Sequence, residues 1–235
     1  MRIRDCNWLQ IEGYLQRDDR IVLPLGSIEQ HAYLSLAVDQ ILAERVSVEA
    51  ADALGVPVLP ALPYGITPYF AVYPGSPSLT AETHGAVLRD LVDSLYRQGF
   101  RRFLLVNGHG GNEAGRAALD AWLTEREDAQ VVWHNWWNAP RTWAEVQAID
   151  PDASHASWLE NFPWTRLPGV GQPQERKPMV DVSAIRDLDP AKVRELLGDG
   201  SFGGLYERPD EDVLRVWRAG VEEVREVLER GWRDA

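Results

Sequence analysis

The stretch Phe103-Leu104-Leu105-Val106-Asn107-Gly108-His109 places four apolar residues directly before a polar turn that contains glycine. A short apolar run of this kind predicts a buried β-strand, and the glycine marks its end. Ile21-Val22-Leu23-Pro24-Leu25-Gly26 shows the same pattern near the start of the chain. We therefore expect two buried strands, each followed by a turn with polar side chains.

Helical segments separate the expected strands. The apolar residues of 80–99 fall on one face, as in an amphipathic helix. Alternation of strands and helices predicts an α/β fold, with three α/β/α layers and a mostly parallel central sheet. We expect one domain over residues 1–235. The expected helices are 39–54, 80–99, 113–126 and 210–230; the expected strands are 21–26, 56–62, 103–106 and 131–133; 64–78 is an ordered loop and 163–181 an irregular excursion.

Composition narrows the class of protein. The 235 residues suffice for a full hydrophobic core, and the net charge of −12 does not suggest the basic face of a nucleic-acid-binding protein. Cys6 is the only cysteine, so no disulfide forms within the chain and a reducing compartment is the simplest interpretation. The N-terminus lacks the apolar core of a signal peptide, and no uncharged apolar run approaches the ~20 residues that span a bilayer. We expect a cytoplasmic protein without a nucleic-acid or membrane partner.

The first candidate site follows the first strand, in Gly26-Ser27-Ile28-Glu29-Gln30-His31. Ligands of parallel α/β sheets bind at the carboxyl ends of strands. Glu29 and His31 are two residues apart, so in an extended backbone both side chains point the same way and could hold a divalent transition metal. A hydrogen-bonded loop histidine is the alternative for His31. A carboxylate directly after a buried strand is costly unless it is paired or bound to a metal.

Asp39 follows eight residues after His31, at the expected start of a helix. Two explanations fit this position, a metal ligand and a helix N-cap, which Asp favours. Taken alone, the position favours the N-cap.

The second candidate site is Val106-Asn107-Gly108-His109-Gly110-Gly111-Asn112, at the end of a central strand. Glycines let the backbone turn sharply and approach a ligand closely. A plain strand-to-helix turn and a phosphate-binding loop are alternatives, but neither glycine-rich phosphate-binding motif is present. The histidine among the glycines favours a metal site at His109.

The third candidate segment is Ser154-His155-Ala156-Ser157-Trp158-Leu159-Glu160. In a helix, His155 and Glu160 would lie within about 140° of each other, so a shared pocket is allowed but not required. An ordinary surface helix explains the segment equally well. His84 and His134 complete the five histidines; we interpret both as structural, with His134 the nearer to the site.

Taken together, these segments resemble the creatininase family of metal-dependent hydrolases. The matching residues run in order from about 20 to 165: Gly26-Ser27-Ile28-Glu29-Gln30-His31, Asp39, Tyr64-Gly65, Pro74-Gly75-Ser76-Pro77-Ser78-Leu79, Asn107-Gly108-His109, and His155-Ala156 with Glu160. The resemblance implies a creatininase-like α/β fold and a centre of two divalent metal ions. It implies that Asp39 bridges the ions and that Glu29, His31 and His109 are further ligands.

The resemblance does not identify the fifth ligand residue position by position. In creatininase a Glu stands two residues after the Asn-Gly-His histidine, where this chain has Gly111. We expect Glu160 to take its place, either as a ligand or as a proton-transfer group. Glu113 is an alternative, but a Glu in the first turn of a helix is explained by the helix dipole. Trp158, Phe162 and Trp164 are expected to form an aromatic wall around Glu160.

The expected activity is hydrolysis of a cyclic amide or related C–N bond by metal-activated water. We expect His155 to carry a proton to the leaving group, because an unperturbed imidazole titrates near neutral pH; a residue that only orients Glu160 is the alternative. A hydrolase or lyase acting on a keto-sugar or cyclitol-type ketone remains open. A non-catalytic metal-containing binding module is disfavoured, because structural zinc sites are usually rich in Cys.

Two departures from the family bear on the substrate. Ala32-Tyr33-Leu34 replaces a Gly-Pro-His segment, and Tyr69-Phe70 replaces a Glu-His pair. Both regions are expected to line the pocket, so we expect a small-molecule substrate other than creatinine. Mixed carboxylate and imidazole ligands suit Zn, Mn or Fe. The resemblance also implies a homo-oligomer, a hexamer.

Overall fold

The sheet is parallel, as expected. The computed structural model describes residues 1–183 and 185–233. In those residues the sheet has three strands in the order β1-β2-β3, namely β1 (Arg20–Leu25), β2 (Arg102–Asn107) and β3 (Gln130–Asn135). Leu25, Asn107 and Asn135 are aligned across the sheet, so the three carboxyl ends meet at one edge.

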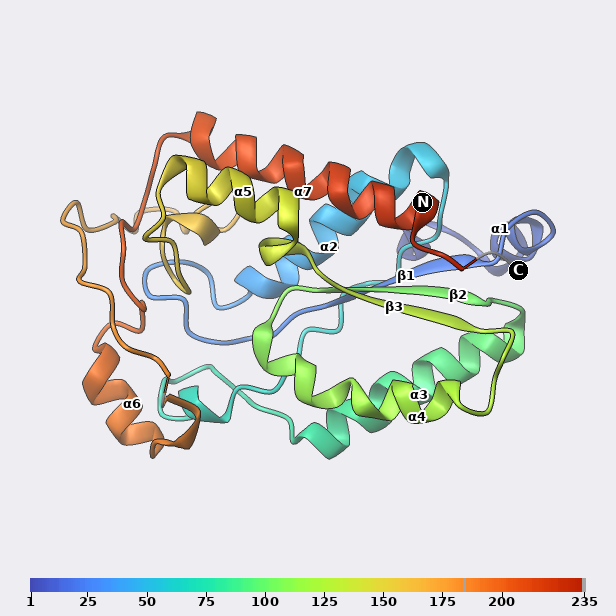
Figure 1. The fold of residues 1–235 in the computed structure, drawn as a ribbon, viewed down its shortest axis with the longest axis horizontal. Coiled ribbons are helices and arrows are strands. Elements are labelled where there is room, and N and C mark those ends of the chain that lie inside the picture. Colours follow the sequence, from blue (N-terminus) through green and yellow to red (C-terminus); the bar gives the residue numbers. More distant parts are fainter. Residues whose placement is uncertain (184, 234–235) are drawn as a thin grey trace.

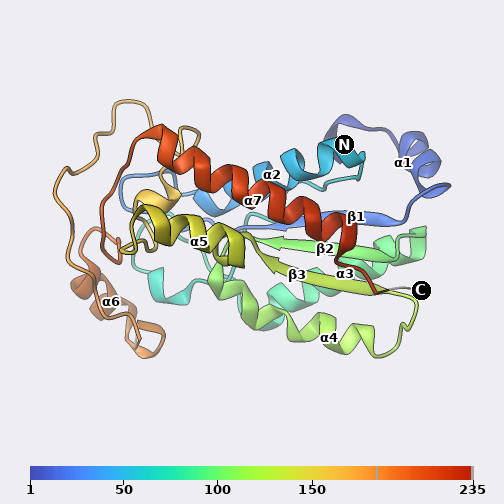
Figure 2. The same cartoon turned by 45° about the horizontal axis from the view of Figure 1, so that its top comes forward.

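Helices cover both faces of this sheet (Figure 1), and a tilted view shows the same layers (Figure 2). One face carries α2 (Val38–Ala51), α5 (Pro140–Ile149) and α7 (Asp210–Arg230); the other carries α3 (Ala81–Gln98) and α4 (Ala117–Leu123). α1 (Trp8–Leu15) lies where the strands begin, and α6 (Pro190–Leu197) lies towards the end where they finish. The three-layer α/β/α arrangement is confirmed.

Side chains of each strand alternate between two apolar cores. Val22 and Val106 pack in the core under α2 and α7. Leu23, Phe103 and Leu105 pack in the core over α3 and α4. β1 and β2 are therefore buried on both faces, which explains why their sequences are almost wholly apolar, whereas β3 is only partly buried.

Truncating Phe103 tests this core. Its side chain is completely buried, so Phe103→Ala should lower the free energy of unfolding by about 3–5 kcal/mol through lost burial and a cavity. Urea unfolding followed by circular dichroism measures the change. Leu91→Ala, on the half-exposed face of α3, is the control and should cost far less. Equal losses of unfolding free energy in the two variants would show that Phe103 does not belong to the core over α3 and α4.

The expected strand at 56–62 does not form, which corrects the sequence analysis. This segment runs beside β1 but makes only isolated parallel bridges, Val58 with Val22 and Leu62 with Leu25. Pro24 stands between the two bridged residues of β1 and has no N–H to donate, so the ladder cannot continue across it.

Helix boundaries differ from expectation in the glycine-rich regions. The expected helix at 113–126 starts as a 3-10 turn, Gly110–Gly115, and becomes α-helical only in α4. Glycine disfavours the α-helix, which explains the delayed start. α1, α5 and α6 were not expected from the sequence; each has at most ten residues. No helix within residues 1–183 and 185–233 combines the length and apolar character needed to cross a membrane.

Candidate metal centre

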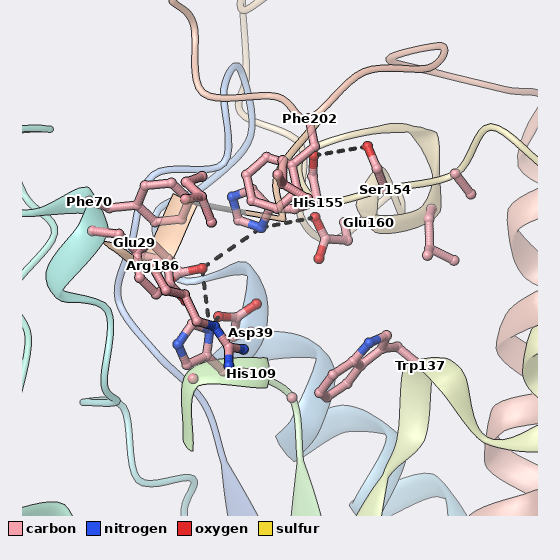
Figure 3. A pocket seen from close by; sticks show the side chains of 18 of the residues that line it. Glu29, Asp39, Phe70, His109, Trp137, Ser154, His155, Glu160, Arg186 and Phe202 are labelled. Carbon is pink, nitrogen blue, oxygen red and sulfur yellow. Dashed lines mark hydrogen bonds and ion pairs between the residues drawn. The ribbon is translucent and has the colours of Figure 1, made fainter. Parts of the chain in front are cut away.

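The candidate residues come from three loops that meet at the carboxyl edge of the sheet. Glu29 and His31 follow β1, and His109 follows β2. Asp39 lies in the first turn of α2, and Glu160 ends the 3-10 turn Trp158–Glu160 after α5. Figure 3 shows the side chains of Glu29, Asp39, His109 and Glu160 directed into one pocket. The structure therefore brings together residues that are up to 131 positions apart in the sequence.

A glycine makes the close approach of β1 and α2 possible. A Cβ atom at Gly26 would lie 2.5 Å from the Cα atom of Gln40. Gly108 is similarly constrained, since its Cβ would lie 2.7 Å from the carbonyl oxygen of Asp39. Both glycines of the sequence motifs thus let the strand ends pack against the start of α2.

Asp39 is shared by two groups of potential ligands. Its Oδ1 lies 3.1 Å from His31 Nε2, and its Oδ2 lies 3.2 Å from His109 Nδ1. Glu29 Oε1 is 3.3 Å from His109 Nδ1, while Glu160 Oε2 is 3.7 Å from His31 Nε2. Two of the groups that could hold a metal ion are accordingly Glu29, Asp39, His109 and His31, Asp39, Glu160.

The N-cap explanation of Asp39 is wrong. The N-cap of α2 is Ala37, and no side chain caps this end of the helix. The Asp39 carboxylate points instead at His31 and His109.

Two histidines are anchored through the nitrogen that faces away from the carboxylates. His31 Nδ1 donates to the carbonyl oxygen of Glu29 at 3.1 Å, and His109 Nε2 donates to that of Ile66 at 3.0 Å. A carbonyl oxygen can only accept, so these nitrogens carry the protons. In the neutral tautomer, the other nitrogen of each ring presents a lone pair towards the carboxylates. This is how metal-binding histidines are commonly oriented.

The donor set fits a divalent metal ion. Glu29 Oε2, His31 Nε2 and Asp39 Oδ2 are buried and have no hydrogen-bond partner among the described residues. Buried polar atoms are almost always satisfied, so such a concentration at one point needs an explanation. Carboxylate oxygens and imidazole nitrogens are ligands of Zn, Mn and Fe alike.

The carboxylates also shape the electrostatics of the histidines. Burial alone would lower the pKa of His31, but the charges of Asp39 and Glu160 outweigh it and raise that pKa well above its ordinary value. Burial would also lower the pKa of His109. The charge of Glu29, together with the hydrogen bonds of His109 to Asp39 and Glu29, outweighs burial and raises that pKa well above its ordinary value. The pocket thus stabilises positive charge at the point where the two groups meet.

His155 differs from the other two histidines. Burial, and then the charge of His31, lower its pKa to about 4, so it is neutral near pH 7. The expectation of an unperturbed imidazole is therefore wrong. His155 Nδ1 lies 3.8 Å from Glu29 Oε1 and 3.9 Å from Glu160 Oε2, so the ring borders both carboxylates.

His155 and Glu160 are not held together by a helix. Ala156 adopts a left-handed conformation with φ of 55°, and its N–H donates to Glu160 Oε2 at 2.5 Å. This turn directs the carboxylate of Glu160 back to the pocket. Glu113 lies apart from the centre, where its Oε1 accepts hydrogen bonds from Trp133 and Asn135.

The remaining histidines lie outside the two ligand groups; His84 is buried and His134 is partly buried. His84 packs against Gly115, near enough for the charge of His109 to contribute to its lowered pKa, although burial is the larger cause. Burial lowers the pKa of His134, and the charge of Glu223 on α7 partly offsets this lowering. Neither histidine belongs to a ligand group or lines the pocket, so both remain candidates for a structural role.

The pocket around the centre has a volume of ≈ 540 Å³. The expected aromatic wall of Trp158, Phe162 and Trp164 is wrong, because Trp158 and Phe162 are buried in the core under α7 and Trp164 packs against it. The actual aromatic lining consists of Tyr69, Phe70, Trp137, Trp143 and Phe202. Tyr69 and Phe70 line the pocket as expected, whereas residues 32–34 do not.

Sequence reasoning missed a second chain segment at the pocket. Ile185, Arg186 and Phe202 line it from either side of α6, in a region to which the sequence analysis assigned no role. Gln30 Nε2 donates to the carbonyl oxygen of Gly200 at 3.0 Å, and a Cβ at Gly200 would lie 1.7 Å from Gln30 Oε1. The cluster of glycines at 198–204 was the available signal for this close approach.

The fold and this centre define an α/β protein with a paired carboxylate–imidazole site at the carboxyl edge of a parallel sheet. The creatininase family model, described as creatinine amidohydrolase, matches residues 4–221. The chain belongs to the creatininase family, and the curated relatives described next are hydrolases by name.

A creatinine amidohydrolase of Pseudomonas putida is 28% identical over 163 residues, which are 64% of this chain and 63% of that protein. A 3-dehydro-scyllo-inosose hydrolase of Thermotoga maritima is 31% identical over 103 residues, 43% of this chain and 33% of that protein. The chain thus matches less than two thirds of the length of either relative. A crystal structure of creatinine amidohydrolase has a TM-score of 0.84 at 21% identity and covers 100% of this chain and 98% of its own. Other solved creatininases of this fold are described as Zn–Zn and Mn forms.

Proposed function

We propose that the protein is a metal-dependent hydrolase that cleaves a cyclic amide or a related C–N bond. One observation carries the proposal: buried, unsatisfied atoms of Glu29, His31 and Asp39 face one another beside a pocket that Glu29 and Asp39 line and that could admit a small molecule. Membership of the creatininase family supports the same reaction class.

The ligand assignment follows from the two groups of side chains. We assign Glu29, Asp39 and His109 to one divalent ion, and His31, Asp39 and Glu160 to a second, with Asp39 shared. Zn, Mn and Fe all suit this set. Bound there, such ions supply Lewis-acid polarisation of a carbonyl and activation of water.

The remaining lining residues bind the substrate and move a proton. Phe70 and Phe202 flank the ring of His155, with centroid distances of 5.1 and 4.9 Å, and fix its orientation. His155 is neutral near pH 7, and its Nε2 donates to the carbonyl oxygen of Gln30. Its free Nδ1 beside Glu29 and Glu160 can therefore accept the proton lost by the attacking water and pass it to the nitrogen released when the C–N bond breaks. The aromatic lining excludes water from the carbonyl under attack.

A substrate screen with metal-loaded protein tests this function. We expect the protein to hydrolyse at least one cyclic amide or cyclic ureide, and mass spectrometry detects the ring-opened product. His155→Ala should lose this activity. Metal-loaded protein that hydrolyses no cyclic amide, cyclic ureide or formamide would reject the reaction class.

A second candidate reaction is favoured by one relative. The Thermotoga maritima protein is a hydrolase of 3-dehydro-scyllo-inosose, a cyclitol-type ketone. The same metal site could polarise a ring ketone instead of an amide. Cyclic ketones of this type belong in the screen, and turnover confined to them would replace the first proposal by the second.

Replacing Glu160 tests the composition of the second ligand group. Glu160→Gln should reduce metal content to about one ion per chain, because a neutral amide is a poorer ligand than a carboxylate. Glu113→Gln is the matched control and should retain two, since Glu113 binds Trp133 and Asn135 outside the centre. Inductively coupled plasma mass spectrometry counts the ions. Loss in Glu113→Gln with retention in Glu160→Gln would reverse the assignment.

A further inference from the structure

One cation that borders the candidate centre has no ion-pair or hydrogen-bond partner among the described residues. Arg186 lies in the 3-10 turn Ile185–Asp187, just before α6, and lines the same pocket as Glu29, Asp39 and Glu160. It is the only Lys or Arg among the described residues that line this pocket. Figure 3 places it on the side of the pocket that carries Glu29 and Phe70, away from Trp137.

The guanidinium of Arg186 has no role in holding the fold together within the described residues. It makes no hydrogen bond and no ion pair with any of them, whereas Arg176 and Arg208 are both paired with Asp150. Its five N–H donors are therefore available to a ligand at the mouth of the pocket.

The charge balance of the pocket favours a negatively charged ligand. Glu29, Asp39 and Glu160 contribute three negative charges, so two divalent ions would leave the centre positive, and Arg186 adds a further positive charge. The chain as a whole carries a net charge of −12 and would repel an anion. A cation at the pocket would therefore be needed to hold a negatively charged ligand there.

The shape of the pocket indicates what carries the charge. Phe202 offers an aromatic surface on one side, and Trp137 offers another opposite (Figure 3). These surfaces suit a planar ring over the centre. A single guanidinium, without a second Lys or Arg in the described lining, matches one planar carboxylate through paired hydrogen bonds.

We propose that Arg186 binds a carboxylate on the substrate, so that the substrate is a cyclic amide or cyclic ureide bearing a carboxylate. This proposal rests on the proposed function, because it places the ring at the same centre. Arg186 selects the substrate and takes no part in bond cleavage. Creatinine itself carries no carboxylate.

Binding of two matched probes tests the proposal without requiring turnover. Hydantoin and hydantoin-5-acetate share the ring and differ by the carboxylate. Calorimetry with metal-loaded protein should show the acetate binding about tenfold more tightly or better, the order expected for a charge-assisted contact. Arg186→Gln should abolish this preference while binding of hydantoin stays unchanged, and Arg186→Lys should retain part of it.

Arg218→Gln removes an equal charge from an exposed position on α7 and serves as the control. It should leave the preference intact. Equal affinities for the two probes, no binding of the acetate, or a preference that survives Arg186→Gln would overturn the proposal. Metal content, measured on the same samples, separates this failure from that of the proposed function: a chain that binds two ions and hydrolyses amides but ignores the carboxylate contradicts Arg186 alone.

Discussion

Asp39→Asn is expected to abolish hydrolysis and to remove both metal ions. Asp39 faces His31 with one oxygen and His109 with the other, at 3.1 and 3.2 Å, so it belongs to both ligand groups. Loss of the metals should lower kcat/KM by on the order of a thousandfold or more, since metal ions supply several kcal/mol of transition-state stabilisation. Metal analysis and steady-state kinetics on the same preparation measure both effects.

Asp150→Asn is the matched control for this substitution. Asp150 is also a buried aspartate, but it is paired with Arg176 and Arg208 and lies outside the ligand groups. Asp150→Asn should lower the free energy of unfolding, but the variant should still bind two metal ions. If both variants lost metal equally, the loss would reflect general unfolding and the role given to Asp39 would be unsupported.

Gly111→Ala is expected to disrupt the centre almost as severely. A Cβ at this position would lie 1.9 Å from the carbonyl oxygen of Ile66 and 2.5 Å from His109 Nε2. That carbonyl anchors the His109 ring, so the added methyl group must displace the anchor, the ring or both. We expect loss of about 1–3 kcal/mol of stability from overpacking, together with reduced metal content.

Gly110→Ala is the neighbouring control, because its Cβ would meet only Trp137, at 4.0 Å. It should retain metal and unfold close to the temperature of the parent chain. Normal metal binding in Gly111→Ala would show that the backbone there yields easily and that the anchor of His109 is dispensable.

The same crowding explains a departure from the family pattern. The resemblance described above places a glutamate where this chain has Gly111, and here that position cannot hold any side chain unless the Ile66 carbonyl moves. Glu160 reaches the centre from another loop, with its Oε2 at 3.7 Å from His31 Nε2. We propose that Glu160 supplies the carboxylate that the family pattern places at this position.

The sequence predicted the layers of the fold because its strands and long helices have strong local patterns. α7 was predicted with its observed bounds, Asp210–Arg230, and α3 within one residue. The strand predicted at 56–62 does not form, because its pairing depends on Pro24 in the facing strand. Pairing between distant segments is not encoded in the local pattern of either one.

The site was predictable where ligands follow strands directly. Glu29, His31 and His109 stand at strand ends, and parallel strands bring their carboxyl ends to one edge. Arg186 could not be found in this way, because it enters the pocket from a long irregular segment. Ligation itself, the hexamer, the cytoplasmic location and the single domain over residues 1–235 stay predictions.

The most direct measurement is anomalous scattering from crystals of the metal-loaded protein. The account predicts two peaks in this pocket. One should lie about 2 Å from ligand atoms of Glu29, Asp39 and His109, and the other equally close to His31, Asp39 and Glu160. Peaks elsewhere on the chain, or a loaded crystal with none between these side chains, would contradict the metal centre and the hydrolase built on it.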